Sequence, residues 1–250
     1  AFNKSQAQAP YCSVAHSANT CPTYYMYVGR FQVKQGATVL FDKADDQCNQ
    51  TTNNVNYTMM STKPSFTLSG GSNYTFSFST GPTYNVYIGV WIDLNQDLDF
   101  ADAGEYFSTG WGQFSTGVTN LQAKNVSIGC NGLKPGTTRM RVRSQYYGSG
   151  DWNAGLSCAT VNYGETEDYT IGLAVPTSLS AGFYMPTTAY EGTPVKMTNN
   201  NQTGYIKHEW DIADNGSIDY TTTNANHIFN TLGTNCVRLK SQNCLGRDSI

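Results

Sequence analysis

Oxygen-bearing side chains gather directly after an apolar stretch in the middle of the chain. Residues 86–92 read Val-Tyr-Ile-Gly-Val-Trp-Ile, and acidic or amide side chains then recur at alternate positions. Carboxylates at this spacing repel one another unless a cation lies between them. Ca²⁺ takes about six to eight oxygen ligands, and a loop with Asp or Asn at its first, third and fifth positions can wrap it. The sequence therefore predicts a calcium loop whose ligands come from Asp93, Asn95, Asp97, Asp99, Asp102 and Glu105.

Within this loop, Asp93, Asn95 and Asp97 are expected to bind through their side chains and Asp99 through its backbone carbonyl, with Asp102 or Glu105 completing the set. The pattern departs from a helical EF-hand, because the closing acid falls at loop position 10 or 13 and Leu98 stands where Gly usually makes the sharp turn. A solvated acidic hairpin loop without a metal is the alternative. Mg²⁺ fits less well, because it keeps more water and demands octahedral geometry.

Catalytic signatures are missing from the sequence. It contains no G-x-S-x-G or H-E-x-x-H motif, and its three histidines are scattered. A glycosidase would need two carboxylates across a cleft, whereas the acids here suit a metal loop better. We therefore expect a protein that is not an enzyme.

Composition points to an extracellular β-protein. Charged residues and aromatic residues each make up 13% of the chain, and Ser, Thr and Asn are abundant. The net charge of −3 comes without a basic stripe, which argues against a nucleic-acid partner. The apolar runs are too short to cross a bilayer, so no membrane insertion of this segment is expected. Ala1 is interpreted as a mature or internal boundary of a secreted or cell-surface protein.

Seven cysteines occur, and none lies in a C-x-x-C pair or at zinc-ligand spacing with His. This pattern favours disulfides formed in an oxidising compartment. The odd number leaves one cysteine free or paired outside the chain. Cys130 with Cys158 is one conceivable pair. Cys236 and Cys244 would lie about 26 Å apart in a straight strand, so they cannot bridge without a bend.

Short alternating runs separated by turn residues fill the chain, and no helical period stands out. The fold class is therefore all-β, as two tandem antiparallel β-sandwich domains. In the run over 137–146, Met140 and Val142 share one face and polar residues share the other. The pattern restarts near residue 175, which places the domain boundary there. The first domain's strands are expected over 24–33, 37–42, 84–94, 137–146 and 167–175, with two more strands around a Gly-Gly-Ser-Asn turn within 65–80.

Three motifs in order resemble the GEVED domain of secreted bacterial proteins. They are VWIDLNQDLDFADAGE at 90–105, GTTRMRVR at 136–143 and YGETEDYTI at 163–171. The resemblance covers about residues 10–174, after an N-terminal extension over 1–9. It implies a β-sandwich of large surface or exported proteins and no catalytic activity. Leu98 and Thr166 replace the usual Gly and Val of the motifs. The acids at 165, 167 and 168 either pair with Arg139, Arg141 or Arg143, or supply a ligand to the calcium site.

Residues 175–250 resemble the polycystic kidney disease (PKD) domain, an immunoglobulin-like sandwich. Trp210 is expected between its sheets, and Asn215-Gly216 suits a type I′ turn. Two roles are open for the acids Asp211, Asp214 and Asp219. They either bind a second calcium ion or belong to turns and strand ends without a metal. The last strand of that family is expected to be missing, which would leave a sheet edge open for pairing.

Aromatic residues in Gly/Ser-rich loops are candidate ligand contacts: Trp111, Tyr146, Tyr147 and Trp152. They could stack on sugars, anchor a protein contact, or pack against the end of the sandwich. The sequence thus predicts a calcium-stabilised structural and adhesive module of a bacterial surface protein. Its expected partners are neighbouring domains, other subunits or another cell surface. A carbohydrate-binding module and a subunit of a surface filament are the alternatives.

Overall fold

The computed structural model describes residues 11–16, 24–44, 48, 56–61, 63–107, 121–177, 179–200 and 205–250. The chain forms two compact units. The first runs through Ala174, apart from two short segments, 69–72 and 129–131, which belong with residues 175–250 in the second unit. The predicted N-terminal extension over 1–9 lies outside the described residues.

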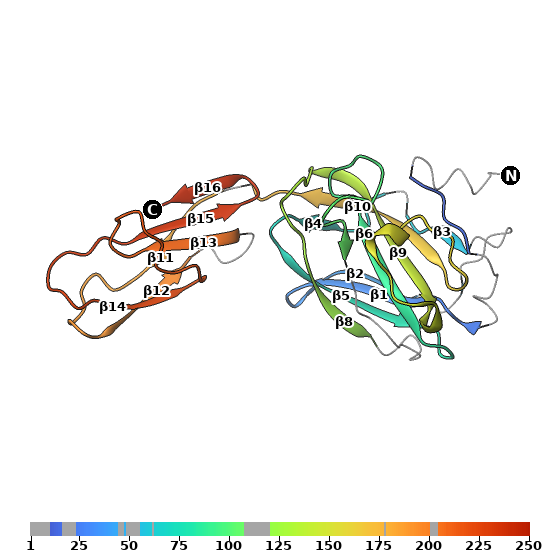
Figure 1. Ribbon diagram of the computed structural model, residues 1–250, viewed down its shortest axis with the longest axis horizontal. Coiled ribbons are helices and arrows are strands. Elements are labelled where there is room, and N and C mark those ends of the chain that lie inside the picture. The colour runs from blue at the N-terminus through green and yellow to red at the C-terminus, as the bar shows by residue number, and fades with distance from the viewer. Residues whose placement is uncertain are drawn as a thin grey trace. The chain divides into compact units, whose positions relative to one another are not determined.

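Two sheets make up the first unit (Figure 1). The smaller sheet is antiparallel and has the order β2-β1-β5-β8. The larger has the order β3-β10-β9-β6-β7, with β4 also paired to β10. In it, β10 runs parallel to β3 and antiparallel to β9. The strands are β1 Val28–Gln35, β2 Thr38–Ala44, β3 Tyr57–Met59, β4 Thr67–Ser69, β5 Asn73–Thr80, β6 Val86–Ile92, β7 Tyr106–Phe107, β8 Gln122–Ser127, β9 Gly136–Tyr146 and β10 Thr166–Ala174.

The two sheets face each other across one aromatic and aliphatic core. Phe31 of β1 stacks on Phe78 of β5 and meets the ring of Tyr169 on β10, at centroid distances of 4.5 and 5.5 Å. Met140 and Val142 point into this core from β9, as their alternation predicts. Burial of this apolar surface is the main stabilising contribution to the unit.

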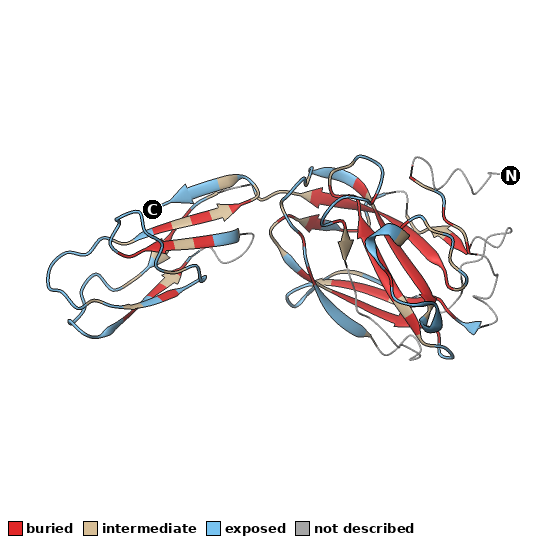
Figure 2. Ribbon diagram, viewed as in Figure 1, coloured by how far each residue is buried: buried red, intermediate tan, exposed pale blue. Residues whose placement is uncertain are grey.

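The larger sheet is buried on its outer face as well. A second cluster of buried rings lies there and comprises Tyr11, Trp91, Phe100 and Trp152. This explains why β6 is apolar along its whole length and not in alternation. In Figure 2, β6 and β10 are accordingly buried for nearly their full length, and β9 is buried over residues 140–145.

The second unit has two three-stranded sheets. Trp210 is fully buried in its core and donates its indole N–H to the carbonyl of Thr222 at 3.0 Å. The expected type I′ turn is absent, because φ is positive at Asp214 and Gly216 but not at Asn215. The strands are β11 Phe183–Tyr184, β12 Pro194–Asn199 and β14 Ala225–Ile228 in one sheet, and β13 Tyr205–Asp211, β15 Arg238–Asn243 and β16 Gly246–Ser249 in the other.

The all-β prediction is therefore confirmed, and helical structure in the described residues is limited to short turns such as η2 Tyr147–Ser149 and η3 Ala154–Leu156. No helix among the described residues is long and apolar enough to span a membrane.

Disulfides are present, but the suggested pairing was wrong. Cys12 bonds to Cys158 and, within the second unit, Cys130 bonds to Cys244. Cys48 is also disulfide-bonded. Cys236 is free and exposed.

A carboxylate loop on a buried charged frame

The loop between β6 and β7 is closed by Glu105, which is 1% exposed. Its Oε1 accepts from the backbone N–H groups of Leu94 and Asn95, at 2.8 and 3.4 Å. Its Oε2 accepts from the N–H of Asp102 at 3.4 Å. Burial raises the pKa of Glu105, and these three N–H groups oppose that rise. Glu105 therefore stabilises the backbone of the loop from its buried side.

Asp93 stabilises the start of the loop in the same way, and it is fully buried. One carboxylate oxygen accepts from the hydroxyl of Tyr11 at 2.6 Å and from the N–H of Leu98 at 3.1 Å. The other accepts from the N–H of Asp97 at 3.3 Å. Leu98 takes a φ of +80°, so the position where the family carries Gly is left-handed here despite its side chain.

Three other carboxylates converge on the exposed side of the loop. Asp97, Asp99 and Asp102 each offer an oxygen, and these oxygens lie within 4.8 Å of one another. The side-chain amide of Asn95 donates to Asp97 and Asp102. This amide is the main cause of the lowered pKa of Asp97, to which Lys134 adds a smaller contribution. The donor set is oxygen-rich and negatively charged, which suits a hard cation such as Ca²⁺.

The six predicted ligands thus separate into two groups. Asn95, Asp97, Asp99 and Asp102 are brought together toward solvent, whereas Asp93 and Glu105 turn inward to the backbone. Asp99 presents its carboxylate to this group. The sequence could not reveal this division, since it depends on Tyr11, which reaches Asp93 from 82 residues away.

Behind the loop, three arginines alternate along the outer face of β9. Arg139, Arg141 and Arg143 place their guanidinium groups over the rings of Tyr11, Phe100 and Trp152, at 4.5, 5.1 and 5.0 Å from the ring centroids. Arg141 and Arg143 are fully buried. Each arginine therefore combines its charge with a ring of the outer cluster.

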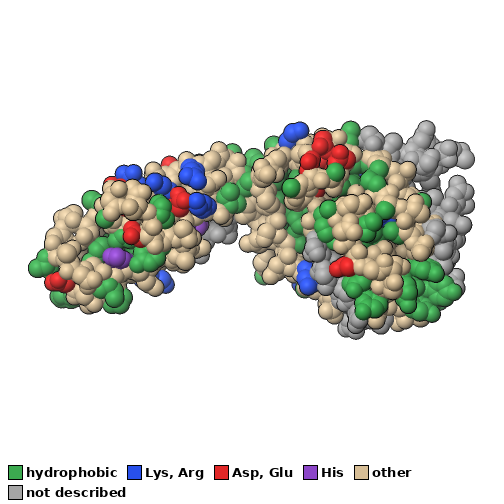
Figure 3. All heavy atoms as spheres, viewed as in Figure 1, with side chains coloured by type: hydrophobic (Ala, Val, Ile, Leu, Met, Phe, Trp, Pro, Cys, Tyr) green, Lys and Arg blue, Asp and Glu red, His purple; other side chains and the backbone are tan. Residues whose placement is uncertain are grey.

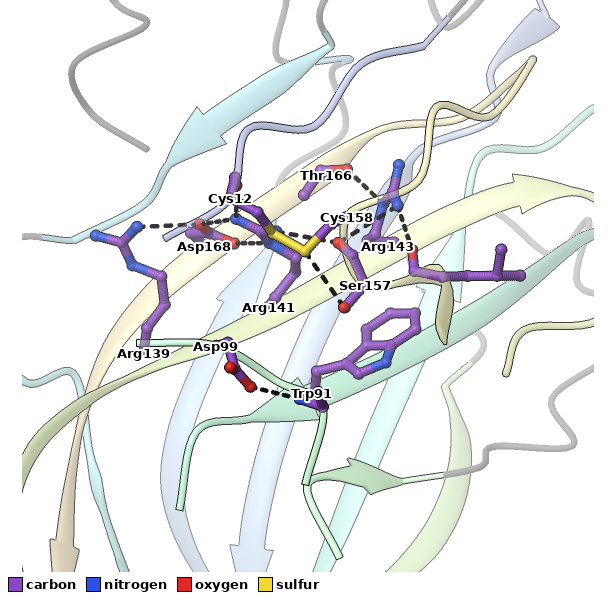
Figure 4. Close-up of a disulfide and its surroundings, with 12 residues drawn as sticks. Cys12, Trp91, Asp99, Arg139, Arg141, Arg143, Ser157, Cys158, Thr166 and Asp168 are labelled. Carbon is purple, nitrogen blue, oxygen red and sulfur yellow. Dashed lines mark hydrogen bonds and ion pairs between the residues drawn. A yellow bond between two sulfur atoms is a disulfide. The ribbon is translucent and has the colours of Figure 1, made fainter. Parts of the chain in front are cut away.

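Asp168 on β10 is the counter-ion of this row. Its carboxylate accepts from Nε and Nη2 of Arg141, at 2.8 and 2.9 Å, in a two-bond pair (Figure 4). The hydroxyl of Tyr57 donates to the same carboxylate at 3.1 Å. Arg141 also donates to the carbonyls of Cys12 and Ser157, at 3.2 and 3.0 Å, beside the Cys12–Cys158 disulfide.

The other motif acids have structural partners as well. Glu165 accepts from the N–H of Val28 at 2.6 Å. Glu167 accepts from Nζ of Lys43 at 2.7 Å and from the hydroxyl of Tyr169 at 2.5 Å. The expected pairing with the β9 arginines is therefore made by Asp168, while Glu165 and Glu167 bind other groups of the protein.

His16 and Arg143 flank Thr166 at the end of this network. The Thr166 hydroxyl lies 3.1 Å from Nε2 of His16 and accepts from Nε of Arg143 at 2.9 Å. Burial, with the nearby Arg143 charge, lowers the pKa of His16 to about 3. Burial and then Arg141 lower the pKa of Arg143 to about 9. At neutral pH Arg143 therefore holds a positive charge and His16 is neutral.

The four candidate ligand-contact aromatics have different surroundings. Trp111 lies outside the described residues. Trp152 is only 5% exposed, since it meets Trp91 edge-on at 5.4 Å and donates to the carbonyl of Tyr87 at 3.0 Å. Of the three roles left open for Trp152, these contacts favour packing against the sandwich. Tyr146 is half-buried, and Tyr147 is exposed.

The acids of the second unit satisfy backbone and arginine groups. Asp211 accepts from the N–H groups of Asn215 and Gly216, at 3.0 and 2.7 Å, and Asp219 accepts from Ile212 at 2.7 Å. Asp214 pairs with Arg238 at 2.7 Å. These contacts match the turn-and-strand-end interpretation.

The carboxylate loop, the three arginines of β9 and Asp168 all lie in the part of the chain that matches a known protein family. The GEVED domain model matches residues 87–172. This GEVED match starts in β6 and ends in β10, so it contains all three sequence motifs, at 90–105, 136–143 and 163–171. It confirms the GEVED resemblance over that span, while the PKD resemblance of residues 175–250 stays a prediction. No curated protein matches the chain.

Solved structures show only remote likeness. One is a Bacteroides ovatus mixed-linkage glucan utilization locus protein, SGBP-B, in complex with a mixed-linkage heptasaccharide. It is 12% identical over 87% of this chain and 45% of that chain, with a TM-score of 0.26. Another comprises the FN1–FN3 domains of chicken CNTN1, 10% identical over 72% of this chain and 59% of that chain, with a TM-score of 0.22. The chain thus spans less than two thirds of either structure.

Proposed function

We propose that this chain is a non-enzymatic, calcium-stabilised structural and adhesive module of a bacterial surface or secreted protein. The observation that carries the proposal is the convergence of Asp97, Asp99 and Asp102 on one exposed side of the loop. Like charges so close together destabilise the loop that holds them. A bound Ca²⁺ would convert this repulsion into attraction and couple the ion to folding.

The frame under these carboxylates supports the same role. Asp93 and Glu105 fix the backbone of the loop through five N–H groups. The exposed oxygens are therefore held in place without the ion, and little conformational entropy is lost when it binds. The residues that would hold Ca²⁺ are Asp97, Asp99 and Asp102, with Asn95 able to present its amide oxygen after rotation about its side-chain bond.

A role outside the cell and outside catalysis is supported by the remaining features. The disulfides fit an oxidising compartment. A groove of about 380 Å³ in the second unit is lined by residues 185–191, 229 and 231–235 together with Val195, and Glu191 is the one carboxylate among its lining residues. A lone carboxylate in a groove falls short of an acid–base pair. The GEVED match adds the context of secreted bacterial modules.

Calcium is expected to raise the melting temperature of the chain by several degrees. A ligand that binds only the folded state at about one hundred times its Kd adds about 2.7 kcal/mol. The measurement is thermal unfolding of the wild-type chain in excess Ca²⁺ and in EGTA, with Mg²⁺ as the comparison ion. Replacing all three carboxylates (D97N, D99N and D102N) should abolish the response. The triple variant should still fold in EGTA, because the repulsion is gone.

The matched control is the double variant D214N and D219N, which removes two carboxylates from the acidic turn of the second unit. It should keep the full calcium response even if its own melting temperature changes. Identical melting curves of the wild-type chain with and without Ca²⁺ would eliminate the calcium part of the proposal.

A further inference from the structure

Tyrosine dominates the exposed large hydrophobic side chains of the first unit. Among its described residues, those that are exposed are Tyr24, Tyr25, Val39, Tyr84, Leu98 and Tyr147. Val39 and Leu98 stand in β2 and in the carboxylate loop. The tyrosines come from the segment before β1, the loop between β5 and β6, and the turn after β9.

Tyr24 and Tyr84 from these segments touch in series with Tyr146 at the end of β9 and Tyr163 before β10. We call these four rings the tyrosine cluster. Their successive centroid distances are 5.4, 6.1 and 5.8 Å, and each ring meets the next edge-on. Tyr147 follows Tyr146 directly and packs on Tyr87 at 5.3 Å. Figure 3 shows hydrophobic side chains gathered at the end of the first unit where β6 begins, while the carboxylate loop follows the other end of that strand.

Backbone contacts hold the three segments together. The N–H of Tyr147 donates to the carbonyl of Asn85 at 3.1 Å, and the N–H of Gly81 donates to the carbonyl of Tyr27 at 3.3 Å. Gly81 is required here, because a Cβ atom would come within 1.9 Å of the carbonyl oxygen of Tyr25. The rings are therefore positioned before any ligand arrives, which lowers the entropy lost on binding.

Charge is absent from the segments that carry the exposed rings. Residues 24–25, 81–85 and 146–150 contain Tyr, Gly, Pro, Thr, Asn and Ser and no charged residue. Each tyrosine offers an apolar ring and a hydroxyl that both donates and accepts. A pyranose ring has the complementary design, with C–H groups on its faces and hydroxyls around its rim. We propose that the tyrosine cluster binds an uncharged polysaccharide.

Two other classes of partner fit this surface less well. Single-stranded nucleic acid also stacks on aromatic rings, but it needs a positively charged groove for its phosphates, and these segments offer none. A protein partner would draw on the apolar anchors that form the centre of an interface. The cluster has no exposed Leu, Ile, Met or Phe among its described neighbours in these segments. The proposal adds a ligand class to the adhesive role above, and it is independent of calcium.

The test is affinity electrophoresis of the chain in gels that contain soluble uncharged polysaccharides, hydroxyethylcellulose and galactomannan, with polygalacturonate as the acidic comparison. We expect retardation in at least one uncharged gel and none in polygalacturonate. The double variant Y24A and Y84A should bind at least roughly tenfold more weakly, since two stacking rings are lost. Tyr190, which is 87% exposed in the second unit, provides the matched control Y190A, which should bind as the wild-type chain does.

Unfolding curves of both variants establish that they are folded, and the conservative change Y84F should keep most of the binding because the ring remains. Binding must also persist in EGTA at a temperature where the chain is folded. The polysaccharide result can therefore be interpreted even if the calcium proposal fails. Retention of binding in the double variant would overturn the proposal. So would the absence of retardation in every uncharged gel, or capture of a protein ligand by the same rings.

Discussion

Replacing Asp168 by asparagine is expected to lower the free energy of unfolding of the first unit by about 3–5 kcal/mol. The carboxylate of Asp168 is fully buried and makes both short hydrogen bonds to the guanidinium of Arg141, which is fully buried as well. The variant leaves that cation in the protein interior without a counter-ion. Urea denaturation followed by tryptophan fluorescence measures the loss, because Trp91 and Trp152 lie in the ring cluster beside these arginines.

The exposed pair of Arg30 and Asp42 supplies the matched control. Its two hydrogen bonds, at 2.7 and 2.6 Å, resemble those of the buried pair, but both side chains are about one-third exposed. D42N should therefore cost at most about 1 kcal/mol. A second variant, R141M combined with D168L, removes both charges and should be less destabilised than D168N alone. Equal losses in D168N and D42N would contradict a buried electrostatic role for Asp168.

The two faces of β9 show how far sequence patterns predict this fold. Alternation correctly placed Met140 and Val142 in the core. The same alternation suggests solvent for the arginines between them, yet Arg141 and Arg143 are fully buried. They are covered by the segment around Tyr11 and by the loop around Trp152 and Ser157, which lie elsewhere in the chain. Local periodicity carries no information about such a cover, whereas charged residues at alternate positions on an otherwise apolar strand could have indicated it.

The sequence predicted where the candidate metal loop lies but not which of its carboxylates face inward and which face solvent. Spacing alone treats Asp93 and Asp97 as equivalent, because both follow the same every-second-residue pattern. The structure separates them, since Asp93 receives the Tyr11 hydroxyl and turns inward, while Asp97 stays exposed. The tyrosine cluster was predicted only at Tyr146, because Tyr24 and Tyr84 are far apart in sequence and meet only in the folded unit.

Loss of the Cys12–Cys158 disulfide is expected to be the second large effect, at about 2–5 kcal/mol. The bond closes a span of 146 residues, so it removes much conformational freedom from the unfolded chain. In the folded state it ties together the two segments whose carbonyls accept from Arg141, at Cys12 and Ser157. The double variant C12S and C158S should therefore unfold at lower urea concentration. The change C236S, which alters the free and exposed cysteine, should leave the midpoint unchanged.

The disulfide and Asp168 hold the same guanidinium group, and this predicts that their effects are coupled. Combining D168N with C12S and C158S should cost less than the sum of the separate losses, by more than about 0.5 kcal/mol. The reason is that Arg141 can move toward water once either the disulfide or the Asp168 carboxylate is lost. Removing the second of the two then lowers the free energy of unfolding by a smaller amount. The triple variant compared with its parents in urea measures this coupling. Strict additivity would mean that the disulfide acts only through the unfolded chain and that the arginine row does not depend on it.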